Sequence, residues 1–196
     1  MIAILDNDAG NLTSVKKAVD YLGYPCLVTF NPREVERADK IMLPGVGHFS
    51  ATSNLEARGL STIVRDAISR NIPLLGICLG MQWMFECSEE APGIAGLALL
   101  RGCCQRFADR VKVPHVGWNQ LQVREGGRLL QSVPSGTFMY FTHSYWAPVV
   151  ECTTAQCQYG STFSAAIERG NLFGVQFHPE KSGDPGLTVL RNFCEL

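Results

Sequence analysis

The sequence predicts a single α/β domain, with a mostly parallel sheet in its first half and a β-rich second half. Three observations support this class. The first half alternates short apolar runs with amphipathic stretches, the second half changes to short segments of period two, and no linker, repeat or low-complexity segment interrupts the chain. A chain of 196 residues can also bury a sufficient hydrophobic core without disulfide or metal crosslinks. We therefore expect one domain over residues 1–196.

The hydropathy pattern of the first half predicts strands that alternate with helices. The first helix can be capped by Asn11 or Thr13, and Gly23 is a stop signal after it. The third strand is ended by the glycine-containing segment 44–47. The predicted strands are 2–5, 26–30, 41–43 and 73–77, and the predicted helices end at residue 22 and span 60–68.

After the fourth strand, a helix is expected to run through residue 85, before Pro92 and Gly93 break the pattern. The segments beyond have the alternation of half-buried strands. The chain closes with an amphipathic helix that carries apolar residues on one face. The predicted strands are 120–123, 137–141, 150–158, 163–167 and 172–177, and the closing helix spans about 185–194.

Charge and hydropathy exclude several kinds of partner. The 17 basic and 18 acidic residues give a net charge of -1, and no run of Lys and Arg could neutralise a row of phosphates, so we expect no nucleic acid. There is no basic leader and no apolar run near about 18 residues, which predicts a cytoplasmic protein without a membrane segment. Charged residues make up 18% of the chain. This is below the usual value of about 25%, which hints at a docked protein partner.

Eight cysteines raise the question of disulfides or a metal. No two of them have C-x-x-C spacing, and the four histidines are scattered, so paired zinc ligands at short spacing are absent from the sequence. We expect reduced thiols, no metal and no cofactor. Seven of the cysteines are interpreted as buried structural residues, namely Cys26, Cys87, Cys103, Cys104, Cys152, Cys157 and Cys194.

Cys78 is the exception, because it lies between Gly76 and Gly80 where an apolar strand turns into a helix. A tight turn of this kind exposes the sulfur, and the unpaired N–H groups of a helix N-terminus stabilise its thiolate. A side chain at either glycine would crowd the turn or the strand beneath it. We interpret Cys78 as a nucleophile for a carbonyl carbon.

His178 and Glu180 follow the apolar run 172–177 and are separated by Pro179. Residues two apart in a strand point the same way, so the carboxylate can hold one ring nitrogen while the other nitrogen moves a proton. By itself, the His-Pro-Glu sequence is also typical of a surface turn. Paired with Cys78, it predicts a Cys-His-Glu catalytic triad.

A thiolate that attacks an amide needs donors for the oxyanion that forms. The backbone N–H of Leu79 is one candidate. The segment Pro44-Gly45-Val46-Gly47 offers a second, with Val46 as the first choice, although an isolated P-G-x-G is more often a plain turn. The G-x-x-x-x-G-K-[ST] pattern of a phosphate loop is absent from the sequence.

Several polar or aromatic residues have weaker interpretations. Asp6 and Asp8 resemble a metal pair, but carboxylates after a first strand usually cap the next helix. His115 and Trp118 are either site or interface residues, or part of the core. His143 is either a structural histidine or, with its neighbours, a contact for a small polar ligand.

Two motifs together resemble the class I (triad) glutamine amidotransferases, namely Gly-Ile-Cys-Leu-Gly-Met-Gln at 76–82 and Gly-Val-Gln-Phe-His-Pro-Glu at 174–180. The matches extend from Leu5 to the C-terminus. The resemblance implies a three-layer, doubly wound, mostly parallel, flavodoxin-like sheet. Further matches are similar to one subfamily, the glutaminase subunit of imidazole glycerol phosphate synthase, and lie at 44–47, 114–119, 140–145 and 177–183.

The resemblance implies hydrolysis of glutamine to glutamate and ammonia through a glutamyl thioester on Cys78, with His178 as general base and then acid, and Glu180 as its orienting partner. It also implies a heterodimer with a (β/α)8-barrel cyclase subunit, which uses the ammonia in histidine biosynthesis. By the same matching, the substrate contacts are Gly45, Gln82, His143, Ser144 and Tyr145, and the residues facing the barrel are Asn11, Trp118, Tyr140 and Lys181.

Three alternatives stay open. A paralogous glutaminase could supply ammonia to another synthase, such as a nucleotide-sugar amidotransferase. A non-catalytic binding module should lack a triad residue, and none is missing. A cysteine peptidase or a redox-sensing protein would not explain Gln82 or the Pro-Glu after His178.

Overall fold

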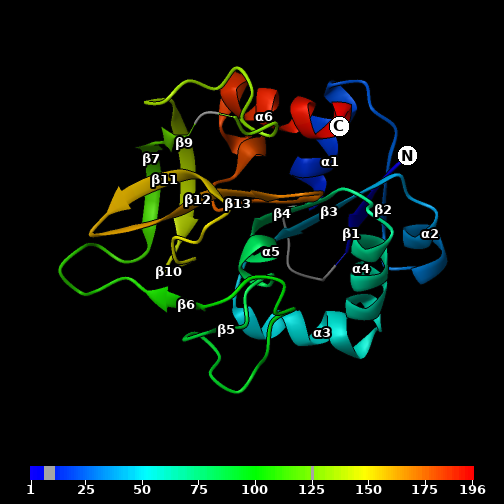
Figure 1. The fold of residues 1–196 in the computed structure, drawn as a ribbon, viewed down its shortest axis with the longest axis horizontal. Helices are drawn as coiled ribbons and strands as arrows, with labels where there is room; N and C mark the ends of the chain where they lie inside the picture. The colour runs from blue at the N-terminus through cyan, green and yellow to red at the C-terminus, as the bar shows by residue number, and fades with distance from the viewer. Residues whose placement is uncertain (7–11, 125) are drawn as a thin grey trace.

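The computed structural model describes residues 1–6, 12–124 and 126–196, and within them a mixed sheet of eight strands runs through the molecule (Figure 1). The first five strands in spatial order are parallel, and each of the last three is antiparallel to its neighbour. The spatial order is β2 (Cys26–Thr29), β1 (Ile2–Leu5), β3 (Lys40–Gly45), β4 (Leu74–Cys78), β13 (Leu172–Val175), β12 (Ser161–Arg169), β11 (Thr153–Tyr159) and β8 (Gln122–Val123).

Helices cover both faces of this sheet. Strand β1 illustrates the two layers, because Ile2 and Ile4 pack in one core cluster, whereas Ala3 and Leu5 pack in the other. The predicted α/β class, with three layers and a mostly parallel, doubly wound sheet, is confirmed. Helices α1 (Leu12–Tyr21) and α6 (Gly183–Glu195) lie on one face, and α2 (Pro32–Glu36), α3 (Thr52–Ala57) and α4 (Leu60–Ser69) on the other (Figure 1).

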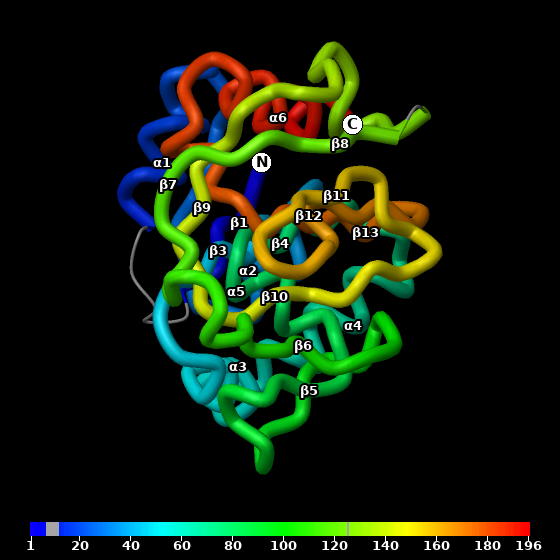
Figure 2. Tube along the Cα trace, turned by 90° about the vertical axis from the view of Figure 1, so that its left-hand side faces the viewer, coloured from blue at the N-terminus to red at the C-terminus, as the bar shows by residue number. Residues whose placement is uncertain are grey.

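Among the described residues, two smaller sheets flank the main one. One is the antiparallel ribbon of β7 and β9, and the other consists of β5, β6 and β10. Figures 1 and 2 show β5 and β6 on the side of α3, away from α6. The bounds are β5 (Cys87–Ser88), β6 (Cys103–Arg106), β7 (His115–Gln120), β9 (Phe138–His143) and β10 (Tyr145–Trp146), and short helical turns lie at α5 (Leu79–Gln82), η1 (Phe49–Ala51) and η2 (Pro179–Lys181).

The predicted segments coincide with strands β1 to β4, β9 and β11 to β13, and with helices α1, α4 and α6. The single strand expected at 120–123 is instead the end of β7 and the short β8. Helix α1 begins at Leu12, so Thr13 lies inside the helix rather than capping it, while Asn11 and Asp8 lie outside the described residues. None of the helices described here is long and apolar enough to cross a bilayer.

The helix expected through residue 85 is wrong, because α5 ends at Gln82. The carbonyls of Trp83, Met84 and Phe85 accept N–H groups from residues 97–100 instead of continuing the helical pattern. This tertiary pairing outweighs the local helical preference of the segment.

The prediction of reduced thiols is wrong for two cysteines. Cys87 and Cys103 form a disulfide, whereas the other six cysteines are free. The two residues are direct partners in the parallel pair of β5 and β6, with their Cα atoms 4.6 Å apart. That distance is within disulfide range, and it arises from a strand pairing that the sequence spacing does not reveal.

Candidate active site

Cys78 lies at a strained turn between β4 and α5. It is the last residue of the strand and has φ 53° and ψ −106°, a conformation that a non-glycine residue adopts only when its surroundings enforce it. A Cβ atom at Gly80 would lie 1.7 Å from the carbonyl oxygen of Leu43, and one at Gly76 would lie 2.6 Å from Cε of Met84. The two glycines therefore leave the space that the turn needs, as the sequence indicated.

The helix that follows Cys78 is too short to stabilise a thiolate strongly. Helix α5 has only four residues, so few peptide dipoles are aligned behind its N-terminus. The expectation of a helix N-terminus for the sulfur is therefore only weakly met. The contacts of Sγ are with other elements, because the thiol reaches the Thr142 carbonyl at 4.0 Å and Nε2 of Gln176 donates to the sulfur at 3.6 Å.

His178 and Glu180 form a buried pair, with Nδ1 of the ring 2.8 Å from Oε1 of the carboxylate. The strand geometry predicted for them is wrong. Strand β13 ends at Val175, and Pro179 begins the 3-10 turn η2, with His178 in extended conformation before it. The turn, rather than strand alternation, brings the carboxylate to the ring. The His178 N–H donates to the carbonyl of Tyr140, which anchors the backbone there.

The pKa of His178 is raised above its ordinary value. Burial acts to lower it, but the negative charges of Cys78 and Glu180 outweigh burial. Within the described residues, Nε2 of His178 is buried and has no partner in hydrogen-bond geometry. Strands β4 and β13 are parallel neighbours, with Ile77 opposite Val175, so the residues that follow them meet at one edge of the sheet. The imidazolium is therefore stabilised next to the sulfur of Cys78.

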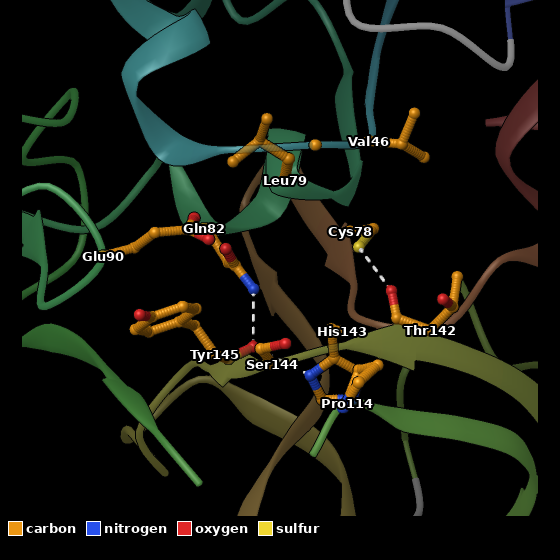
Figure 3. A pocket seen from close by; sticks show the side chains of 11 residues that line it. Val46, Cys78, Leu79, Gln82, Glu90, Pro114, Thr142, His143, Ser144 and Tyr145 are labelled. Carbon is orange, nitrogen blue, oxygen red and sulfur yellow. Dashed lines mark hydrogen bonds between the residues drawn. The ribbon is translucent and has the colours of Figure 1, made fainter.

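A pocket of about 190 Å³ opens beside Cys78 (Figure 3). Both predicted oxyanion donors, Val46 and Leu79, line it, whereas Gly45 does not. Gly45 is instead the partner of Cys78 in the parallel pairing of β3 and β4. It directly precedes Val46, which does line the pocket. The remaining wall is made by Gly47, Gln82, Glu90, Pro114, Thr142, His143, Ser144 and Tyr145.

Gln82 and His143 reach the pocket but are bonded within the protein. Nε2 of Gln82 donates to the carbonyl of Tyr145 at 2.8 Å, as drawn in Figure 3, and to Oε1 of Gln176 at 3.2 Å. Nδ1 of His143 donates to the same carbonyl at 2.8 Å. The Tyr145 carbonyl thus accepts two N–H groups, one for each of its lone pairs.

His115 and His143 form a neutral pair on the inner face of the β7–β9 ribbon. Burial lowers the pKa of His143 to about 3 and that of His115 to about 4. A carbonyl can only accept, so Nδ1 of His143 carries the proton and its Nε2 accepts from Nδ1 of His115, 3.1 Å away. Asn119 in turn donates to Nε2 of His115 at 3.4 Å. Both ring nitrogens of His143 are therefore occupied.

Two residues near the nucleophile were missed in the sequence. Glu90 lines the pocket, and its Oε2 accepts the Phe49 N–H at 2.7 Å, but it lies in a turn with no recognisable motif. Gln176 is fully buried beside Cys78. The sequence feature that could have pointed to Gln176 is its polar side chain inside the otherwise apolar run 172–177.

The outer face of the β7–β9 ribbon is apolar and exposed. Trp118 is 56% exposed and is paired across the strands with Tyr140, their rings 6.0 Å apart. Nζ of Lys181 lies 5.9 Å from the Tyr140 ring centre. Val116 and Phe138 extend the same face. The predicted docking residues Trp118, Tyr140 and Lys181 are therefore neighbours, and Asn11 lies outside the described residues.

The family model described as glutamine amidotransferase class-I matches residues 3–196. The chain belongs to this family. The imidazole glycerol phosphate synthase subunit HisH of Moorella thermoacetica is 50% identical to it, over 100% of this chain and 94% of the relative. The subunit of the same name from Methanocaldococcus jannaschii is 43% identical over 100% of both chains.

Solved structures of more distant proteins agree in fold with this class I glutamine amidotransferase. One described as a glutamine amidotransferase has a TM-score of 0.78 at 20% identity and covers 99% of this chain and 97% of its own. PurLQS from Thermotoga maritima has a TM-score of 0.74 at 17% identity, with the same coverage of 99% and 97%. Across the described part of the chain, no group of three or more His, Cys, Asp or Glu side chains could hold a metal ion.

Proposed function

We propose that this chain is the glutaminase subunit of imidazole glycerol phosphate synthase. It hydrolyses glutamine to glutamate and ammonia and delivers the ammonia to a (β/α)8-barrel cyclase subunit in histidine biosynthesis. The observation that carries the proposal is the position of Cys78, at a strained turn in a pocket and beside the buried pair of His178 and Glu180. The names of relatives at 43% and 50% identity support this reaction over other uses of a thiol nucleophile.

The raised pKa of His178 favours its imidazolium form beside the sulfur of Cys78. The thiolate of Cys78 attacks the side-chain carbonyl carbon of glutamine, and the C–N bond breaks as His178 gives its proton to the leaving nitrogen. Ammonia leaves, and a glutamyl thioester remains on Cys78. His178 then takes a proton from water, which attacks the thioester and releases glutamate. Glu180 keeps Nδ1 protonated, so that Nε2 carries each transferred proton.

The oxyanion that forms in each step needs backbone donors. The N–H of Leu79 follows Cys78 directly and is one donor. The second is the N–H of Val46, at a bend where Gly47 has φ +105°. We infer that docking of the cyclase brings this amide into position, because a segment containing glycine next to the pocket wall can change its backbone direction at low cost. The isolated subunit is then nearly silent.

The charge on the pocket wall suits the α-ammonium group of a free amino acid. In the described part of the chain, Glu90 is the only acidic side chain on the pocket wall, so its carboxylate is the partner for the α-ammonium of glutamine. Gln82, Ser144 and Tyr145 supply neutral polar groups around it. The ring nitrogens of His143 are occupied, so His143 supports the wall rather than donating to the substrate.

The exposed apolar face of the β7–β9 ribbon is the proposed docking site for the cyclase. Trp118 and Tyr140 supply aromatic contact area, and Lys181 supplies a positive charge beside them. By resemblance, Asn11 extends this surface. The inner face of the same ribbon carries His115 and His143, which places the pocket wall directly behind the docking face.

A glutamine-directed electrophile tests the proposed function. Diazo-oxo-norleucine, followed by peptide mapping of the complex with the barrel subunit, is expected to label Cys78 alone. Labelling at another residue, or none with the partner present, would remove the glutaminase proposal. Rescue of a histidine auxotroph by the pair of subunits then identifies the synthase, because a paralogue that serves another pathway would label at Cys78 but fail to rescue.

A further inference from the structure

We propose that Gln176 is a positioning residue for the nucleophile, whose side-chain amide donates to the sulfur of Cys78 and favours its thiolate form. The inference rests on the proposed function of the Cys78 site. Gln176 follows β13 and precedes Phe177, so it lies on the edge of the sheet where β4 delivers Cys78. Its side chain is fully buried, and Nε2 lies 3.6 Å from Sγ.

The direction of this amide is set by its neighbours. The carbonyl of Tyr145 can only accept, so the atom of Gln82 that meets it is the NH2 nitrogen. The same nitrogen donates to Gln176 at 3.2 Å, which identifies the facing atom of Gln176 as its carbonyl oxygen. The NH2 group of Gln176 is left to face Cys78. Gln82 therefore donates to Gln176, and Gln176 in turn donates to the sulfur.

The acceptor that orients these two amides, the carbonyl of Tyr145, is itself held in place. The Tyr145 carbonyl belongs to β10 and also accepts from Nδ1 of His143, whose ring is held in turn by His115. Neither histidine can reverse its role without gaining a charge in a buried site, where burial lowers both pKa values. The orientation of Gln176 thus follows from a backbone carbonyl and two neutral rings, rather than from its own torsional preference.

A donor aimed at the sulfur has a specific chemical effect. A thiolate accepts a hydrogen bond much more strongly than a thiol does, so a fixed N–H stabilises the charged form. Because α5 is only four residues long, this amide supplies stabilisation that a longer helix would otherwise give. The amide contacts Sγ from the segment that leads into His178, whose Nε2 carries the transferred protons in the proposed reaction.

The test is the pH dependence of alkylation at Cys78, which does not require glutamine. Iodoacetamide is applied to the isolated subunit across a pH series, and the Cys78 peptide is quantified by mass spectrometry. In Gln176→Met, the pH midpoint of the reaction is expected to rise by about one unit. Gln156→Met on β11 is the matched control and is expected to keep the wild-type midpoint.

A second variant separates positioning from packing. Gln176→Glu keeps the acceptor for Gln82 but places a carboxylate against the sulfur, and is expected to raise the midpoint by more than Gln176→Met does. Circular dichroism checks that each variant is folded. An unchanged midpoint in either folded variant overturns the proposal for Gln176. A different result would overturn the proposed function alone. In that case the two variants shift the midpoint as expected, but the wild-type protein does not hydrolyse glutamine with its partner.

Discussion

Nδ1 of His178 and Oε1 of Glu180 lie 2.8 Å apart, and both side chains are almost completely shielded from solvent. A buried carboxylate in this position fixes the tautomer of the ring and stabilises its cation. The relationship is local, because His178 directly precedes the 3-10 turn that contains Glu180, yet its effect is exerted at the opposite ring nitrogen.

Glu180→Gln is expected to lower kcat for glutamine hydrolysis by about 10² to 10⁴-fold, because the neutral amide no longer stabilises the imidazolium. KM should change little, since Glu180 does not line the pocket. Steady-state assays of the complex with the barrel subunit measure both constants. A variant that retained the wild-type kcat would show that the carboxylate has no part in the reaction.

Gly80→Ala is expected to destabilise the protein by about 2 kcal/mol or more, because the new Cβ would meet the Leu43 carbonyl at 1.7 Å. Gly93→Ala is the matched control. Gly93 has open space around it, so its free energy of unfolding should change by no more than about 0.5 kcal/mol. Urea denaturation measures both variants, and equal stability of the two would contradict the close approach of α5 to β3.

The buried neutral His143 makes stability depend on pH. Its folded pKa of about 3 lies below the unfolded value, so the unfolded chain is protonated first as the pH falls, and stability is lost toward acid. Between pH 7.5 and pH 5 this residue should account for a loss of about 2 kcal/mol.

His143→Asn can still donate to the Tyr145 carbonyl and has no titrating ring. The fall in the free energy of unfolding over the same pH interval is expected to be smaller in the variant than in the wild type by that amount. His115 and His178 are retained in both proteins. Denaturation curves at the two pH values decide it, and identical falls would mean that His143 is charged when folded.

The disulfide between Cys87 and Cys103 closes a loop with a sequence separation of 16 residues. Loss of such a crosslink is expected to lower the free energy of unfolding by about 3 kcal/mol, because the unfolded chain gains freedom. The double variant Cys87→Ser with Cys103→Ser should match the reduced wild type, while Cys26→Ser should behave like the oxidised protein. A wild type whose urea midpoint is insensitive to dithiothreitol would argue against the crosslink.

If the β7–β9 face is the docking site proposed above, Trp118→Ala is expected to weaken binding to the proposed barrel subunit at least about tenfold, because large aromatic side chains contribute strongly to the affinity of interfaces. Phe30→Ala is the control, because Phe30 is similarly exposed, at 58%, but lies outside the β7–β9 ribbon. It follows β2, which is the edge strand of the main sheet at the end opposite β8. Calorimetric titration with the barrel subunit measures both affinities. Equal losses in the two variants would point away from the β7–β9 face.

The long elements could be predicted from sequence because they bury continuous apolar patterns. Strands β3 and β4 and helix α4 fall in this group, since each carries its own periodic signal. Strands β5, β6 and β10 have two to four residues and exist through tertiary pairing, so no local pattern marks them. The disulfide was missed for the same reason.

The candidate site shows the same division. Motifs identified Cys78, His178 and Glu180, and the glycine turn around Cys78 followed from steric arguments that the structure bears out. The geometry of His178 and Glu180 did not follow, because a proline turn replaces the strand that was expected. Glu90 reaches the pocket through a loop whose path is set by distant contacts, which a single sequence does not encode locally.

The strand that delivers Cys78 and the strand that precedes His178 are adjacent in space but about a hundred residues apart in the chain. In the growing polypeptide, Cys78 is therefore synthesised long before His178 and Glu180. The three groups can meet only when β13 lies beside β4 in the folded sheet. A fragment that ends before β13 would therefore hold the thiol without its proposed partners, and the wall of the pocket beside Cys78 likewise needs residues from both halves of the chain.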